Sequence, residues 1–167
     1  ILRSDSLAES VKVREFESKF KKLVSAKHAI AVTSGTSALE IALKAVNVND
    51  KKVIMPSNTF FATSIAVTNS GGIIELVDAE LENFSICPKS LRSKITKETG
   101  AVIVVHIGGI ISRNIREIKK ICDDHGVPLI EDAAHAHCSN YDGLFAGTIG
   151  DIGCFSFFPT KVMTTGE

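Results

Sequence analysis

Hydrophobic and polar residues follow two alternating patterns along this chain. Short continuous apolar runs, bounded by Gly, Pro or polar residues, are typical of buried strands. Such runs lie at residues 28–32, 52–55, 72–78, 101–106, 129–132 and 152–156. Six strands are therefore predicted, the first of them a buried strand from His28 to Val32.

Between these runs the apolar residues recur with helical spacing. The first helix is predicted to open at Ser6, with Glu9 at the reciprocal position of a capping box. The strongest helix is predicted to have Asn114 as its cap and to stop at Gly126, because glycine readily takes the left-handed conformation that ends a helix. Three further helices are predicted at about residues 38–46, 60–69 and 90–95.

This alternation of strands and helices predicts one α/β domain. Strands joined through helices run parallel, so we expect three layers, a mostly parallel sheet with helices on both faces. A chain of 167 residues is long enough for one such domain and short for two. Ligands of these folds bind at the carboxyl ends of the strands, and the polar candidates of this chain all follow predicted strands.

Charge and composition narrow the classes of partner. The chain has 19 basic and 19 acidic residues, so its net charge of zero gives no electrostatic reason to expect nucleic acid or an anionic membrane. The longest apolar stretch, residues 101–111, is too short to span a bilayer, and the first residues have no signal-peptide pattern. We therefore expect a cytoplasmic protein whose four cysteines are reduced and mostly buried.

The polar turn at residues 34–37 is the first candidate site. It lies between a predicted strand and a predicted helix, where unpaired backbone amides and the helix dipole favour a phosphate. Gly35 would let the backbone approach the ligand closely, and Thr36 and Ser37 would add hydroxyl groups. The turn lacks the spacing of dinucleotide and P-loop sites, and ordinary helix capping by Ser or Thr is the favoured alternative for this motif alone.

Two adjacent acids, Glu131 and Asp132, end a predicted strand and are followed by His135 and His137. A carboxylate at this place can hold a protonated pyridine nitrogen, since a nearby anion in a low dielectric favours the charged ring. The alternatives are an Asp that caps the next turn, and a metal site built from the two histidines and Cys138. We expect no metal, because no second cluster is spaced to complete a tetrahedral set.

Lys161 lies five residues after Ser156 and follows a Phe-rich segment. A lone lysine is usually a solvated surface charge. Partial desolvation beside the phenylalanines would instead leave an amine able to condense with an aldehyde cofactor as a Schiff base. Lys161 is therefore the candidate for covalent catalysis, provided that a phosphate site and a partner for the ring nitrogen lie nearby.

Four ordered motifs of the chain resemble those of one family. Residues 34–39, 59–63, 131–136 and 150–157, followed by Lys161, look like the DegT/StrS family of pyridoxal-phosphate-dependent aminotransferases of nucleotide sugars. The resemblance spans nearly the whole chain. It implies the large domain of a type I aminotransferase, with a mostly parallel seven-stranded sheet and a homodimer whose active sites lie at the subunit interface.

The resemblance also assigns residues to the cofactor, pyridoxal 5'-phosphate. Lys161 matches the lysine that forms the Schiff base and then carries a proton between cofactor and substrate carbons. Asp132 matches the partner of the pyridine nitrogen, and His135 matches the residue near the phenolic oxygen. Phe60 occupies the place of the aromatic residue that stacks on the ring.

The phosphate of this cofactor would be bound at the candidate turn. Gly35, Thr36 and Ser37 would supply backbone amides and a hydroxyl, helped by Ser156. The implied reaction moves an amino group from a donor, usually glutamate, to a keto-sugar nucleotide and yields an amino sugar. The implied partners are a nucleotide-sugar substrate and an amino-acid donor, together with a homodimer or higher self-association.

The chain departs from the family in length. Family members are much longer, so residues 1–167 resemble an incomplete cofactor-binding large domain without the C-terminal small domain. Two other functions stay open. One is a sugar dehydratase with the same cofactor, although relatives of that kind replace the lysine at this place with histidine. The other is a non-catalytic or inert fragment of the same fold.

Overall fold

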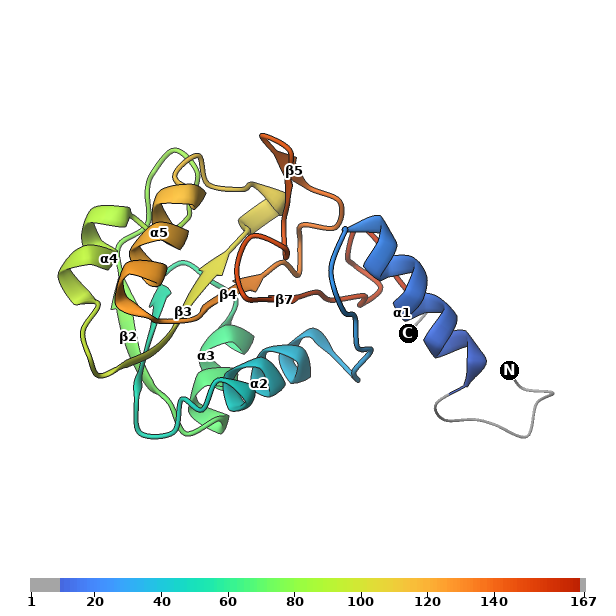
Figure 1. The fold of residues 1–167 in the computed structure, drawn as a ribbon, viewed down its shortest axis with the longest axis horizontal. Coiled ribbons are helices and arrows are strands. Elements are labelled where there is room, and N and C mark those ends of the chain that lie inside the picture. The colour runs from blue at the N-terminus through green and yellow to red at the C-terminus, as the bar shows by residue number, and fades with distance from the viewer. Residues whose placement is uncertain (1–9, 166–167) are drawn as a thin grey trace.

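A five-stranded parallel sheet lies at the centre of the fold (Figure 1). The structure, a computed structural model, describes residues 10–165. The strands are β1 Lys52–Pro56, β2 Ile73–Val77, β3 Thr99–Val105, β4 Leu129–Asp132 and β7 Ile152–Cys154. They pair in the order β2-β1-β3-β4-β7, and every pair is parallel. A separate antiparallel pair, β5 Asn140–Tyr141 and β6 Leu144–Phe145, follows β4.

Helices cover both faces of this sheet, which confirms the predicted three-layer α/β class (Figure 1). α2 Gly35–Ala45 and α3 Phe61–Asn69 pack on one face, and α4 Pro88–Lys94 and α5 Ile115–His125 pack on the other. α1 Val11–Leu23 lies away from the sheet, beside the segment that follows β7. A short 3-10 turn, Ile107–Gly109, follows β3.

Consecutive strand residues belong to opposite cores. Val102 lies in the core under α4 and α5, and the next residue, Ile103, lies in the core under α2 and α3. All seven residues of β3 are buried, because a central parallel strand is covered on both faces. It follows that the adjacent acids at the end of β4, Glu131 and Asp132, face different layers.

The predicted strand at residues 28–32 is wrong. This segment is irregular, and Ile30 is 81% exposed. Its Ala31 amide donates instead to the Glu17 side chain of α1 at 2.7 Å. The apolar run has the composition of a strand, but within residues 10–165 no neighbouring strand offers it a hydrogen-bonding ladder. This run does not pair and the β5–β6 hairpin stands apart, so five strands form the main sheet within the described residues. The seven strands that the family resemblance implies refer to a complete large domain.

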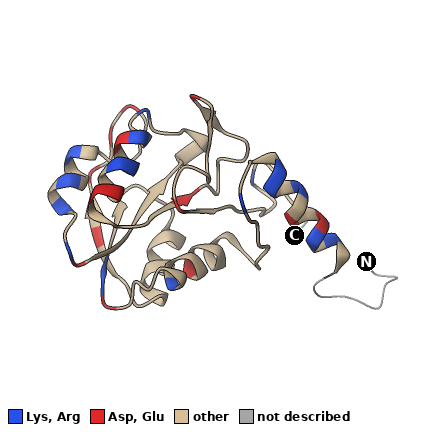
Figure 2. Cartoon of the chain, viewed as in Figure 1, with Lys and Arg blue, Asp and Glu red and all other residues tan. Residues whose placement is uncertain are grey.

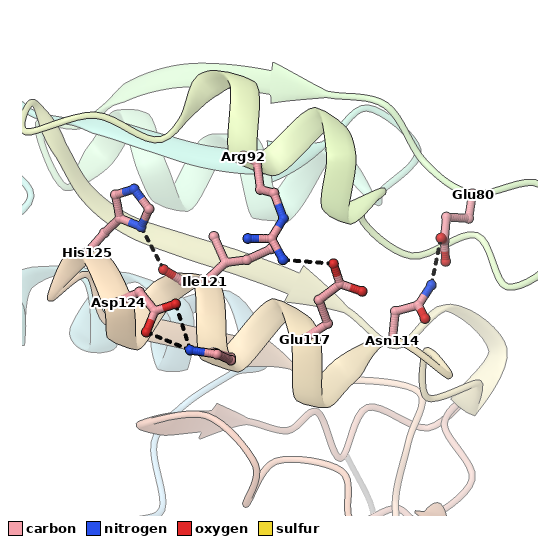
Figure 3. A network of polar contacts seen from close by, with 8 residues as sticks. Glu80, Arg92, Asn114, Glu117, Ile121, Asp124 and His125 are labelled. Atoms are coloured by element: carbon pink, nitrogen blue, oxygen red, sulfur yellow. Dashed lines mark hydrogen bonds and ion pairs between the residues drawn. The ribbon is translucent and has the colours of Figure 1, made fainter.

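The predicted ends of α5 are only partly correct. Gly126 ends the helix in the left-handed conformation with a φ of 65°, as expected. Asn114 is the N-cap residue, but its side chain donates to Glu80 at 2.8 Å instead of capping (Figure 3). Glu117 pairs with Arg92 of α4 at 2.9 Å (Figure 3). The predicted capping box at residues 6–9 lies outside the described residues.

Charged residues are unevenly distributed over the helices. They gather on α1, α4 and α5, whereas α2 carries only Glu40 and Lys44, and α3 carries none (Figure 2). On α3, the apolar side chains of Phe61 and Ile65 are exposed. The face formed by α2 and α3 is therefore the less polar side of the sheet.

Candidate active site

The turn at residues 34–37 begins α2. The Ser34 hydroxyl accepts a hydrogen bond from the Ser37 amide at 3.0 Å, so Ser34 caps the helix as the alternative interpretation supposed. The Ser37 hydroxyl lies 3.0 Å from both the Thr33 and the Ser34 hydroxyls. Within the described residues, the backbone amides of Gly35 and Thr36 have no hydrogen-bond partner. Besides the cap, the turn thus offers two N–H groups and the positive end of the helix dipole to an anion.

Gly35 lies directly against Ser156, a residue predicted for the same site. A Cβ atom at position 35 would be 2.9 Å from Ser156 Cβ and 3.4 Å from the Phe155 carbonyl oxygen. Two side-chain carbons do not approach that closely, so the contact requires glycine. Ser156 is itself buried. The start of α2 and the segment after β7 therefore meet at one place, although they are far apart in the sequence.

Asp132 lies at the carboxyl end of β4 and is only 7% exposed. Its Oδ2 accepts a hydrogen bond from the Thr63 hydroxyl at 2.9 Å, and its Oδ1 accepts one from the Ala134 amide at 3.2 Å. Because the single hydroxyl proton of Thr63 goes to the carboxylate, Thr63 accepts from the Thr59 hydroxyl, 2.8 Å away. The carboxylate is thus oriented from α3 and retains lone pairs for one further donor.

Thr63 is a site residue that sequence reasoning missed. It is fully buried, and its spacing of four from Thr59 places both hydroxyls on one side of the start of α3. That spacing after a strand was the available signal. Phe60, predicted to stack on the cofactor ring, is the N-cap of α3 and is 61% exposed, with its ring centroid 4.3 Å from that of Phe61.

Two histidines follow Asp132 in the loop after β4. The Nδ1 atom of His135 accepts a weak hydrogen bond from the Gly108 amide at 3.4 Å. His137 is 6% exposed, and neither of its ring nitrogens has a hydrogen-bond partner within the described residues. Burial lowers the pKa of His137, and the nearby charges of Lys161 and His135 lower this pKa further, whereas the Ser156 backbone raises it. A neutral imidazole is therefore held beside the segment that carries Ser156 and Lys161.

Lys161 lies in a turn beyond β7, where its backbone amide donates to the Phe158 carbonyl at 2.9 Å. The side chain is partly buried. Within residues 10–165 the Lys161 side chain makes no hydrogen bond or ion pair with Asp132. Its positive charge instead lowers the pKa of His137. The structure thus brings Gly35 and Ser156 into contact and orients Asp132 from α3, while Lys161 lies on the same segment as Ser156.

An aromatic cluster anchors that segment. The ring of Phe20 on α1 packs edge-on against Phe155 and Phe157, with centroid distances of 4.9 and 5.3 Å. The Phe16 ring contacts Phe157 at 5.0 Å, and the His137 ring contacts Phe157 at 4.9 Å. Edge-to-face pairs of this kind fix ring orientation, so α1 stabilises the backbone on both sides of Ser156.

The cysteines only partly follow the prediction. All four are free thiols; Cys122 and Cys154 are buried, Cys87 is half-buried and Cys138 is exposed. Burial raises the pKa of the Cys154 thiol to about 12, and the charges of Asp132 and Glu131 act in the same direction.

No group of three or more metal-ligating side chains occurs within the described residues. None of their helices is long and apolar enough to cross a membrane.

Comparison with known proteins identifies the family. The model of the DegT/DnrJ/EryC1/StrS aminotransferase family matches residues 1–167. The chain belongs to this family. It is 37% identical over 156 residues to the 3-amino-5-hydroxybenzoate synthase of Amycolatopsis mediterranei. The matched region covers 93% of this chain and 40% of the relative. It is 35% identical to the GDP-perosamine synthase of Vibrio cholerae, covering 93% of this chain and 42% of the relative.

Solved structures of this DegT-family fold include cofactor-bound forms. A putative sugar aminotransferase from Streptococcus pneumoniae in its PLP form superimposes with a TM-score of 0.94 at 26% identity, covering 99% of this chain and 46% of that one. An E. coli GDP-4-keto-6-deoxy-D-mannose-3-dehydratase with bound hydrated PLP superimposes with a TM-score of 0.87 at 26% identity, covering 95% and 42%. This chain therefore spans less than half the length of the relatives it matches.

The residues of this DegT-family chain fit pyridoxal phosphate. At the start of α2, two amides without a hydrogen-bond partner among the described residues and a glycine in contact with Ser156 suit the binding of a phosphate. At the end of β4, a nearly buried carboxylate fixed by Thr63 suits a protonated ring nitrogen. An exposed Phe60 at the start of α3 offers an aromatic face.

Proposed function

We propose that residues 1–167 belong to the cofactor-binding large domain of a sugar aminotransferase that uses pyridoxal phosphate. The observation that carries the proposal is the oriented, nearly buried carboxylate of Asp132, whose strand pairs at Cys154 with the segment that brings Ser156 against Gly35. Pyridoxal phosphate, when bound, supplies an electron-accepting ring that lets an amino group leave one carbon and join another. The family membership supports this chemistry.

Each candidate residue has a stated task in this proposal. The amides of Gly35 and Thr36 and the hydroxyls of Ser37 and Ser156 bind the phosphate, because they surround the positive end of α2. The Asp132 carboxylate, aligned by Thr63, would hold the protonated ring nitrogen.

The remaining three residues act around the ring. Phe60 packs on one face of it. His135 would be the residue near its phenolic oxygen. Lys161 would hold the cofactor by condensing with its aldehyde group, with release of water, and would later move a proton at the substrate carbon. The proposed substrate is a keto-sugar nucleotide, and the proposed amino donor is glutamate.

A direct test is covalent capture of the cofactor by the chain. Pyridoxal phosphate is added to the protein, the visible absorbance is recorded, the sample is reduced with borohydride, and the modified peptide is identified by mass spectrometry. We expect one adduct, on Lys161. Lys161→Ala should abolish the absorbance and the adduct, whereas Lys22→Ala, at an exposed position of α1, should leave both unchanged.

The outcomes separate the alternatives. Adducts spread over several surface lysines, or no adduct at all, would overturn the proposal and leave an inert fragment of the fold as the better description. The resemblance to the E. coli dehydratase makes product analysis the second arm. If a keto-sugar nucleotide supplied with glutamate lost a hydroxyl group instead of gaining an amino group, the proposed function would be that of a sugar dehydratase and not of an aminotransferase.

The proposal includes association of the chain with itself. The less polar face of α2 and α3 exposes Phe61 and Ile65, and Phe60 is exposed beside them. Exposed apolar groups gathered on one face mark surfaces that other protein covers. Sedimentation should show dimers or larger species, and a monomer at high concentration would contradict this part of the proposal.

A further inference from the structure

Glu131 is a fully buried carboxylate with four hydrogen-bond donors. Its Oε1 accepts from the amides of Ile149 and Gly150, both at 2.6 Å, and its Oε2 accepts from the amide of Gly147 at 2.8 Å. The Nε2 atom of His106, also fully buried, lies 2.8 Å from Oε2. Donors on every side compensate the loss of water around a carboxylate, so Glu131 joins β4 to residues 147–150.

Residues 147–150 fit closely under the strand that follows them. Gly147 has a φ of +82°, and a Cβ atom there would be 2.3 Å from the ring of Phe155. A Cβ atom at Gly153 of β7 would be 2.2 Å from the Gly147 carbonyl oxygen. The position of the Gly147 backbone therefore decides where β7 and the Phe155 ring can lie.

Phe155 in turn lies close to Gly35 of the proposed phosphate site. Its carbonyl oxygen is 3.4 Å from where a Cβ atom of Gly35 would be, and the next residue, Ser156, is closer still. On the strand, Glu131 is followed directly by Asp132, which faces the opposite layer. One buried carboxylate thus fixes two parts of the site, the end of β4 and the segment after β7.

We propose that Glu131 is a positioning residue of the cofactor site. By binding the Gly147 amide it holds Phe155, and through Phe155 it holds Ser156 against Gly35 in the geometry that binds the phosphate. This inference rests on the proposed function, and Glu131 itself touches neither cofactor nor substrate.

The variant Glu131→Gln isolates this link. A glutamine that keeps its oxygen toward Ile149 and Gly150 places an NH₂ group toward Gly147 and His106. His106 can accept from that NH₂ group in the tautomer that carries its proton on Nδ1, but the Gly147 amide loses its acceptor and meets a donor. The fold keeps most of its contacts, while the tether to Gly147 is broken.

A matched control lies on the same segment. Asp151 accepts a hydrogen bond from the Leu129 amide at 2.8 Å, so it joins the same loop to the opposite end of β4. Asp151→Asn removes the charge of that carboxylate without touching Gly147. Both variants are compared with the unaltered chain in three measurements: urea unfolding, the dissociation constant and visible spectrum of bound pyridoxal phosphate, and hydrogen exchange of the amides at residues 155–157 and 35–37.

Glu131→Gln should weaken pyridoxal phosphate binding by about tenfold or more, since small displacements in a preorganised site have effects of this order. It should also speed exchange at both segments. Asp151→Asn should change binding by about twofold or less, even after correction for its own loss of stability. Equal effects of the two variants on binding and exchange would show that Glu131 contributes general stability alone and would overturn the inference. An unaltered chain that forms no adduct overturns the proposed function instead, and unchanged exchange in Glu131→Gln overturns the positioning role whether or not the cofactor binds.

Discussion

The hydrogen bond from Thr63 to Asp132 gives the sharpest prediction about the site. Thr63→Val keeps the shape of the side chain and removes the only hydroxyl that α3 directs at the carboxylate. Asp132 then loses one donor in a place that water barely reaches, since Thr63 is fully buried and Asp132 nearly so. The Thr59 hydroxyl loses its partner as well.

The size of the effect follows from two opposing contributions. A hydrogen bond to a charged group stabilises a fold by about 1.5–3 kcal/mol. The new methyl group of valine returns about 0.8 kcal/mol by burial. The net loss of unfolding free energy is therefore about 1–2 kcal/mol. With a slope of about 1–3 kcal/mol per molar urea, the midpoint of unfolding should fall by about 1 M.

Urea denaturation measures this loss directly, and the same helix offers a control. Thr68 is exposed, and its hydroxyl bonds the Ser64 carbonyl at 3.1 Å. Thr68→Val should change the free energy of unfolding by less than about 0.5 kcal/mol. If Thr63→Val costs no more than Thr68→Val, the reasoning about the buried carboxylate is wrong.

A double-mutant cycle then assigns the energy to the pair. In Asp132→Ala no side-chain acceptor is left for the Thr63 hydroxyl, so each single variant removes the hydrogen bond between the pair. The coupling between Thr63→Val and Asp132→Ala should reach about 1 kcal/mol. Additive effects would mean that the two side chains do not act together in solution.

Three further predictions follow from the structure. Gly35→Ala forces a Cβ atom against Ser156, so urea denaturation should show a loss of about 1–3 kcal/mol; no loss would mean that the two segments do not touch. Burial lowers the pKa of His137 below its usual 6.5, so the unfolded chain binds more protons, and the stability from the neutral ring is lost as the pH falls below that value. The urea midpoint should therefore drop less on acidification in His137→Phe than in the unaltered chain, and equal drops would contradict the assignment. Because burial raises the pKa of Cys154 to about 12, a thiol reagent at neutral pH should modify the exposed Cys138 first and Cys154 only after unfolding; equal rates would refute the burial.

The sequence was sufficient for elements whose pattern is completed locally. α5 combines a regular apolar stripe with Gly126, and the end of the helix requires the left-handed conformation that glycine readily takes. Both features can be recognised in the amino-acid sequence. The strand ending in Asp132 was also predicted within its bounds. The parallel direction of the strands and the two covered faces follow from the same alternation, because parallel neighbours need crossing helices.

Features that depend on distant partners were not predictable in this way. The run at residues 28–32 resembles a strand, but a strand needs a neighbour, and Ala31 binds Glu17 instead. Asn114 has the residue type of a cap, yet Glu80 takes its side chain from another loop. Thr63 and Glu131 became site residues only when the fold placed Asp132 and Gly147 beside them.

The contact between Gly35 and Ser156 also has a consequence for how the chain folds. Most of the described chain separates these two residues, and β7 is the last strand of the sheet along the sequence. A contact this distant in sequence closes late and slowly, because the entropy of ordering the intervening chain must be overcome first. During synthesis the start of α2 leaves the ribosome long before its serine partner exists. We therefore expect the helix start to complete its surroundings in one of the final steps of folding.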